Sequence, residues 1–397
     1  LGTLLFHLIT GGKVPAFLGS SFAFLGGYAA VAPMIDDTLP NTELLPYACF
    51  GVACAGLVYA VLAALVRAFG AEKVMRFFPP IVTGPIIIAI GLNLSASAIN
   101  NCSGNWWIAI AAILIIVAAN IWGRGMVKII PILLGVVGSY LLAVAFDAEV
   151  RATLVKNVSE AALLALPVKM DQTVFGLFAR GNVDRDMLLT AVITIVPLSL
   201  ATMVEHIGDV SAISSTCGRN YIQDPGLHRT LLGDGLATTL AALFGAPANT
   251  TYGENTGVLA LSRIYDPRVI RIAAVLAMCF SFSPKFAAII SSMPGGTIGG
   301  VSLVLYGMIS AVGVRNVVEN QVDFTKSRNV LIAALILVLS IGISYSKAGA
   351  LTFGSVSLSG LAVGSLVGIV LNAVMPGKDY VFGQNPQGDE SVNFIIQ

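Results

Sequence analysis

Apolar stretches long enough to cross a bilayer follow one another along this chain, and short clusters of charged residues separate them. A membrane-spanning helix needs about 20 mostly apolar residues. Only 11% of the residues are charged and 56% are hydrophobic, whereas about 25% of the residues of a soluble domain are charged. Most of the surface is therefore expected to face lipid. The pattern predicts an all-α, multi-pass protein of the cell membrane with about thirteen apolar segments, among them Ile270–Met293 and Val356–Met375.

The charges in the loops predict an orientation. When successive loops alternate sides, starting with residues 11–13 in the cytoplasm, most of the 22 Lys and Arg fall on the cytoplasmic side, which is the side that basic loops favour. The long stretch 147–186 then lies outside the cell, and the polar tail 376–397 lies in the cytoplasm.

Net charge and residue counts exclude some classes of partner. A net charge of +1 argues against nucleic acid, because binding phosphates requires an excess of basic groups. Three His and five scattered Cys form no pattern typical of a metal site. We expect neither a metal nor a cofactor.

Three ionisable residues, Glu205, His206 and Asp209, lie in the middle of the apolar segment Met187–Ile213. Each such group costs about 2.5–3.5 kcal/mol at the centre of a membrane helix. Glu205 and Asp209 are one helical turn apart and share a face, and His206 lies beside them. Three ionisable groups on one turn cannot all face lipid. They either line a pathway for substrate or protons, or form a polar network that joins helices.

A second polar stretch, Asn249–Gly257, lies between apolar runs and follows Pro247. At membrane depth an irregular backbone is tolerated only where it lines a cavity or is buried in protein. Glu254 and Asn255 would present an acceptor and an amide side by side, which suits a planar ring with alternating N–H and C=O groups. An ordinary loop outside the membrane is the alternative.

The two halves of the chain contain similar breaks. Pro15-Ala16 leads to Ser20-Ser21-Phe22 in one half, and Pro247-Ala248 leads to Thr250-Thr251-Tyr252 in the other. Matching interrupted segments are a good sequence indicator of a transporter's binding site. An aromatic residue at such a break, Phe22, can stack on a flat ligand, although a single Phe is more often part of the core.

These motifs together resemble those of the nucleobase–ascorbate transporters (nucleobase:cation symporters), and within them the bacterial uracil permeases. The resemblance covers nearly the whole chain. The family signature begins with Glu or Gln, continues with Asn-x-Gly and ends in Thr-Arg; here it begins with residues 254–257 and ends in Ser262-Arg263. The other matching stretches are residues 13–24, Glu205–Gly208, Asp224–Arg229, and Gly299–Ser302 with Tyr306.

The resemblance implies a fold of about fourteen transmembrane segments in two inverted seven-segment repeats. The first segment is expected to precede Leu1. Segments three and ten each hold a short strand, and the two strands meet at the substrate. The implied divisions are a core part (1–80), a gate part with the long outer loop (81–186), a second core part (187–293), a second gate part (294–375) and the cytoplasmic tail (376–397).

The resemblance also implies roles for single residues. The expected substrate-binding residues are Glu205, Glu254, Phe22, Tyr252, Gly253, Asn255 and Tyr306. The expected proton-coupling residues are Glu205, Glu254, His206 and Asp209. Glu254 is typical of the uracil type, since the purine branch more often has Gln there. Two positions depart from the pattern, because many uracil permeases have His at the position of Asp209 and Thr at the position of Ser262.

The implied function is import of uracil by proton symport through alternating access, without enzymatic activity. A homodimer through the gate segments is also expected. The repeat of Gly360, Gly364 and Gly368 predicts a close-packing face towards another helix, within the chain or in a second copy.

Several alternatives remain open. A xanthine or urate permease is the nearest one. A channel would have polar rings along a pore, whereas the polar groups here cluster at two places. Glu205 and His206 could act as an acid/base pair in a membrane enzyme, but no nucleophile or metal-binding set accompanies them. Anion exchangers share a related architecture, but acidic groups in the pocket disfavour an anion.

Overall fold

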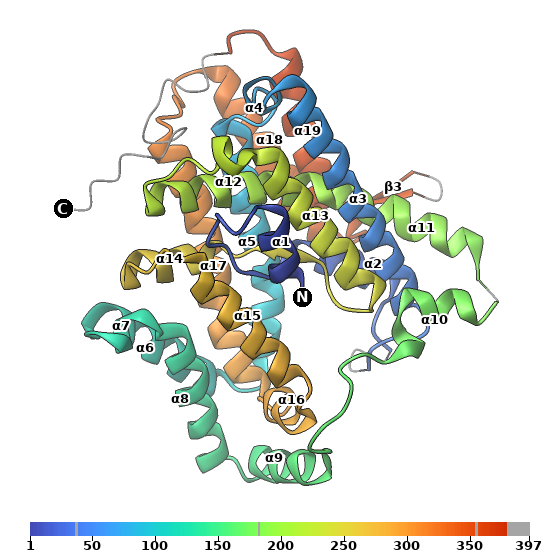
Figure 1. Cartoon of the computed structure of the whole chain (residues 1–397), viewed down its shortest axis with the longest axis vertical. Helices are drawn as coiled ribbons and strands as arrows, with labels where there is room; N and C mark the ends of the chain where they lie inside the picture. Colours follow the sequence, from blue (N-terminus) through green and yellow to red (C-terminus); the bar gives the residue numbers. More distant parts are fainter. Residues whose placement is uncertain (36–38, 182, 354–355, 379–397) are drawn as a thin grey trace.

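The computed structural model of this chain is mostly helical and describes residues 1–35, 39–181, 183–353 and 356–378 (Figure 1). Within that part, five helices are long and apolar enough to cross a membrane, and the number rises to seven if each of two bent pairs is one span. The structure therefore agrees with a multi-pass membrane protein. Most of the predicted tail, 379–397, lies outside the described residues.

The first half of the chain contains helices α1 to α10 and the first strand. Their bounds are α1 Gly2–Ile9, β1 Leu18–Ser20, η1 Phe22–Phe24, α2 Leu25–Val31, α3 Leu45–Phe69, α4 Ala71–Met75, α5 Pro80–Ser103, α6 Trp106–Trp122, α7 Met126–Ile129, α8 Pro131–Phe146, α9 Ala148–Glu160, η2 Met170–Gln172 and α10 Val174–Ala179.

The second half contains the remaining helices and three more strands. Their bounds are α11 Arg185–Ile195, η3 Val196–Leu198, α12 Ser199–Cys217, η4 Ile222–Gly226, α13 Leu227–Leu243, β2 Asn249–Thr251, α14 Gly253–Ser262, α15 Pro267–Ser281, α16 Pro284–Ser291, α17 Gly295–Glu319, α18 Ser327–Ser344, β3 Ala350–Phe353, β4 Val356–Ser359 and α19 Gly360–Val374.

Proline and polar caps fix where many of these helices begin. Helices α5, α8, α15 and α16 each start with a Pro, whose missing N–H has no intrahelical partner at that position. The side chains of Asp147, Asp184 and Asp266 accept hydrogen bonds from first-turn N–H groups of α9, α11 and α15. Such caps satisfy donors that the helix itself leaves unpaired.

Two apolar segments differ from the sequence-based expectation. The expected single segment Ile270–Met293 is bent by 92° between α15 and α16, because Pro284 interrupts the first helix and Ser283 caps the second. The expected segment Val356–Met375 begins as strand β4, which pairs with β3 in an antiparallel hairpin, and becomes helical only at Gly360.

Glycines bring the main helix pairs into close contact. Helix α3 packs along α13, and α5 packs along α17. A Cβ on Gly56 of α3 would lie 2.6 Å from the carbonyl oxygen of Gly235 of α13, and a Cβ on Gly313 of α17 would lie 2.7 Å from that of Gly84 of α5. Small residues allow this backbone approach in membrane helices, where lipid is as apolar as the side chains.

The glycine repeat of α19 packs within the chain. A Cβ on Gly364 would lie 2.7 Å from the backbone oxygen of Ile336 in α18, and a Cβ on Gly360 would lie 2.9 Å from the backbone nitrogen of Ser344. The predicted close-packing face is thus confirmed, and its partner is the neighbouring helix α18.

Helix α6 shows the surface expected in lipid. Trp107 and Trp122, near its two ends, are 73% and 74% exposed. Fifteen residues of helix separate them by about 22 Å. Aromatic residues at both ends of an apolar helix are typical of the two membrane–water interfaces.

Candidate functional site

Two broken segments from distant parts of the chain meet as the antiparallel strands β1 and β2. The register pairs Leu18 with Thr251, Gly19 with Thr250, and Ser20 with Asn249. The ladder continues at both ends, because the N–H of Ser21 donates to the oxygen of Ala248 (2.7 Å) and the N–H of Tyr252 donates to that of Phe17 (3.1 Å). These bonds satisfy backbone groups that lipid could not. The two predicted strands are therefore present, and they are joined.

Tyr252 packs against this strand crossing. The ring of Tyr252 lies against Gly19 so closely that a Cβ on Gly19 would overlap it. The Tyr252 hydroxyl lies 3.2 Å from the backbone oxygen of Ser20, to which it donates, and 3.2 Å from the Ser20 hydroxyl. Only glycine leaves room for the ring at this point of β1.

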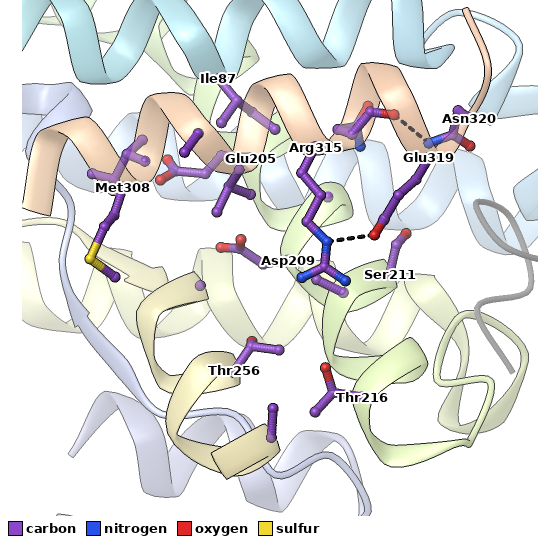
Figure 2. A pocket seen from close by; sticks show the side chains of 18 residues that line it. Ile87, Glu205, Asp209, Ser211, Thr216, Thr256, Met308, Arg315, Glu319 and Asn320 are labelled. Atoms are coloured by element: carbon purple, nitrogen blue, oxygen red, sulfur yellow. Dashed lines mark hydrogen bonds and ion pairs between the residues drawn. The ribbon is translucent and has the colours of Figure 1, made fainter. Parts of the chain in front are cut away.

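A cavity of about 310 Å³ lies between helices α12 and α14 on one side and α17 on the other (Figure 2). The α12 and α14 wall consists of Glu205, Gly208, Asp209, Ser211, Ala212, Thr216, Gly253, Thr256 and Ala260. The opposite wall consists of Met308, Ile309, Ala311, Val312, Arg315, Asn316 and Glu319 of α17, with Asn320 directly after it and Ile87 of α5. The volume is near the lower end of the range for small-molecule sites, ~300–1,000 Å³.

Carboxylates and the start of a helix meet in this cavity. Asp209 is 4% exposed and lines it together with Glu205. A Cβ on Gly253 would lie only 2.7 Å from Oδ1 of Asp209, so the absence of a side chain lets the start of α14 approach this carboxylate. The first turn of a helix presents N–H groups without intrahelical partners. The cavity therefore places acidic groups beside the start of a helix.

His206 faces away from the cavity, towards α13. Its Nδ1 lies 2.9 Å from Oδ2 of Asp234, and both side chains are fully buried. The same nitrogen lies 3.3 Å from Oγ1 of Thr251 in β2. That hydroxyl donates to Oδ2 of Asp209 at 3.3 Å. A buried polar chain thus runs from α13 through α12 and β2 to the cavity wall.

The other end of the cavity is also polar. Nε of Arg315 donates to Oε1 of Glu319 at 2.5 Å, and Nδ2 of Asn320 donates to the backbone oxygen of Asn316 at 2.8 Å. In the sequence, Arg315 is only one of the basic residues that the loop charges assign to the cytoplasmic side. Its place in the cavity depends on how α17 packs, which no local pattern reveals.

The predicted proton-coupling residues separate in space. Glu205 and Asp209 line the cavity as one helix face, and His206 lies on another face of α12. Glu254 is the second residue of α14, and its side chain lies outside the described residues.

The predicted aromatic and amide residues lie apart from the described cavity lining. Phe22 and Tyr306 contact each other edge to face, with ring centroids 5.2 Å apart. Tyr252 follows β2, and its ring lies against Gly19 of β1, as described above. Asn255 lies in the first turn of α14, where its N–H donates to the oxygen of Tyr252 at 3.2 Å.

Asp234 was missed by the sequence analysis. It stands between Gly233 and Gly235 in the apolar run that forms α13 and is fully buried. An ionisable residue inside a membrane segment marks a functional or paired group, and that rule alone would have found Asp234.

The chain was then compared with known proteins. Residues 1–349 match the model of a permease family, Xan_ur_permease. The chain belongs to this permease family. The uracil permease of Bacillus caldolyticus is 39% identical over 392 residues, which cover 95% of this chain and 84% of that one. The uracil permease of Bacillus subtilis (strain 168) is 36% identical over 389 residues, with the same coverage of both chains.

The permease also resembles a solved structure. The overall structure of SLC26A9 aligns with a TM-score of 0.57 at 13% identity, over 97% of this chain and 63% of that one. At so low an identity the likeness concerns the fold. Because the matched family consists of permeases, the chain is a membrane transport protein and not an enzyme.

Proposed function

We propose that this permease is a secondary active transporter that imports uracil together with a proton through alternating access. The observation that carries the proposal is the cavity in which Glu205 and Asp209 meet the start of α14 beside the β1–β2 crossing. The two relatives described above, which are 39% and 36% identical to this chain, are named uracil permeases, which favours uracil over a purine.

The proton has a physical role in this site. Burial disfavours the charged form of a carboxyl, and Asp209 is almost completely buried. A protonated carboxyl can donate a hydrogen bond to a carbonyl of the base, which a carboxylate cannot. Binding of proton and base then favour each other, which is the linkage that symport requires. Glu205 and Glu254 are the residues proposed to contact the base, with Asp209 and His206 assisting the proton.

The two walls of the cavity support a rocking mechanism. One wall comes from α12 and α14, in the proposed core part 187–293, and the other comes mainly from α17, in the proposed gate part 294–375. In the described chain α3 packs on α13, whereas α5 packs on α17. The first pair joins the two proposed core parts, and the second pair joins the two proposed gate parts. Relative movement of core and gate would open the site to one side at a time.

Further parts of the proposal come from the resemblance and the loop charges. They are fourteen segments in two inverted repeats, a homodimer through the gate segments, and a cytoplasmic C-terminus. The molar mass of the protein in detergent tests the dimer, and the accessibility of a tag after residue 397 tests the orientation.

Thermal unfolding with a panel of bases tests the substrate. A ligand that binds only the folded state raises the melting temperature by mass action. We expect uracil to stabilise the purified protein more than xanthine, uric acid or adenine does. Stabilisation by xanthine alone would reassign the permease to purines.

Transport itself is tested in proteoliposomes. We expect saturable uracil uptake that is faster when the outside is more acidic than the inside, and that collapses when a protonophore is added. Uptake that rises linearly with concentration and ignores the proton gradient would favour a channel.

A further inference from the structure

The cavity runs from a buried end to an exposed end. Along α12, Glu205 and Thr216 are eleven residues apart, or about 16 Å of helix, and both line the cavity. Asp209, near the first end, is 4% exposed, whereas the side chain of Arg315, near the other end, is 51% exposed. Figure 2 shows Arg315 and Glu319 projecting from α17 towards Ser211 and Thr216 of α12. The exposed end is therefore a mouth lined by polar side chains from both walls.

The charged pair at this mouth lies at the end of α17. Glu319 is the last residue of α17, where the negative end of the helix dipole disfavours a carboxylate. Arg315 precedes it by four residues, and a basic residue before an acidic one is the less stabilising order of an i,i+4 pair. Both side chains line the cavity and therefore face what enters it.

An unused acceptor lies beside the pair. Nδ2 of Asn320 donates to the backbone oxygen of Asn316, whose side chain accepts from Thr83 at 3.1 Å. This arrangement leaves Oδ1 of Asn320 buried and without a hydrogen-bond partner among the described residues. Thr256, which is 94% buried on the opposite wall, likewise has a hydroxyl without a partner in that part of the chain. Polar atoms that the fold leaves unsatisfied in a cavity indicate a ligand or water.

We propose that Arg315, Glu319 and Asn320 form a second, outer subsite that holds the base at the cytoplasmic mouth of the cavity. The proposal rests on the proposed function. Arg315 donates to a ring carbonyl, and Oδ1 of Asn320 accepts from the neighbouring ring N–H; these are the partners that alternate along the edge of uracil. Glu319 orients the guanidinium. The mouth is cytoplasmic because the loops after α12 and α17 carry Arg219 and Lys326, on the side that basic loops favour.

Sided transport measurements test this subsite. Initial rates of radiolabelled uracil movement are measured in right-side-out and inside-out membrane vesicles at equal pH on both sides. For Arg315→Gln and for Asn320→Ala, we expect the half-saturation concentration at the cytoplasmic face to rise about five- to tenfold, as for the loss of one hydrogen bond. The half-saturation concentration at the outer face changes less than twofold. Arg315→Lys, which keeps the charge but loses the planar fork, gives an intermediate rise.

Arg76→Gln is the matched control. Arg76 forms a similar i,i+4 ion pair with Glu72 (3.7 Å) and does not line the cavity. We therefore expect Arg76→Gln to leave the half-saturation concentration at both membrane faces at its wild-type value. The subsite is refuted if Arg315→Gln and Asn320→Ala leave the cytoplasmic value within twofold of wild type, or if they raise the values at both faces equally. A selective effect at the outer face would overturn the cytoplasmic assignment. A wild-type protein that carries no uracil would instead overturn the proposed function itself.

Discussion

Removing one partner of the buried pair between His206 and Asp234 is expected to destabilise the protein strongly. Both side chains are fully buried and their nearest polar atoms lie 2.9 Å apart. A carboxylate and a protonated imidazole at this separation attract by about 6 kcal/mol at an effective dielectric constant of ~20, and such an attraction offsets the cost of removing both groups from water. Asp234→Leu leaves His206 without that compensation. We expect it to lower the free energy of unfolding by about 3–5 kcal/mol.

A double-mutant cycle measures this coupling. The free energies of unfolding of wild type, Asp234→Leu, His206→Leu and the double variant are determined by denaturant titration in detergent, followed by circular dichroism. The double variant buries no unpaired partner, so we expect its destabilisation to be at least ~2 kcal/mol smaller than the sum of the single effects.

An exposed ion pair provides the control. Lys13 and Asp224 approach to 2.5 Å, but their side chains are 49% and 71% exposed. Asp224→Ala should therefore change the free energy of unfolding by less than about 1 kcal/mol. Single effects below ~1 kcal/mol at His206 and Asp234 that simply add in the double variant would refute the reasoning about the buried pair.

Three further predictions concern packing and the cavity. Gly364→Ala should destabilise the α18–α19 contact by about 1–3 kcal/mol in thermal unfolding. Gly342→Ala, whose Cβ would meet nothing within 4 Å, should leave the stability unchanged, and equal effects would contradict the packing argument. Glu205→Gln should make uracil uptake at least tenfold slower and insensitive to an imposed pH gradient in proteoliposomes, because the amide cannot exchange a proton; an unchanged pH response would exclude Glu205 from coupling. Gly19→Ala should weaken uracil binding more than tenfold in a thermal-shift titration, because the new Cβ displaces the Tyr252 ring from the strand crossing; wild-type affinity would show that the crossing does not shape the site.

The sequence was most informative where polar residues and prolines interrupt apolar runs. The breaks after Pro15 and Pro247 indicated two interrupted segments, the resemblance implied a short strand in each, and β1 and β2 occupy those places. The physical basis is local, since backbone polar groups at membrane depth must find partners within the protein. The spacing of Glu205 and Asp209 likewise placed both on one helix face, and both line the cavity.

The rest of the site depends on contacts between distant helices. Nothing near Arg315 in the sequence indicates that it shares a cavity with Asp209, because that requires α17 to pack beside α12. The partner of His206 could not be identified either, since Asp234 lies on α13 and meets it only after the helices assemble. The bend between α15 and α16 was missed although it has a local signal, since Ser283 and Pro284 mark the start of a new helix.

The two walls of the cavity are held by different partners, and this difference bears on the proposed rocking movement. On one side, Thr251 links β2 to both His206 and Asp209 of α12, and His206 links α12 to Asp234 of α13. These buried contacts join three elements and favour movement as one body, since breaking any of them exposes an unpaired polar group to an apolar surrounding. Helix α17 is held to α5 instead. The proposed site therefore lies between one wall joined to β2 and α13 and another joined to α5, as the proposed movement of a gate against a core requires.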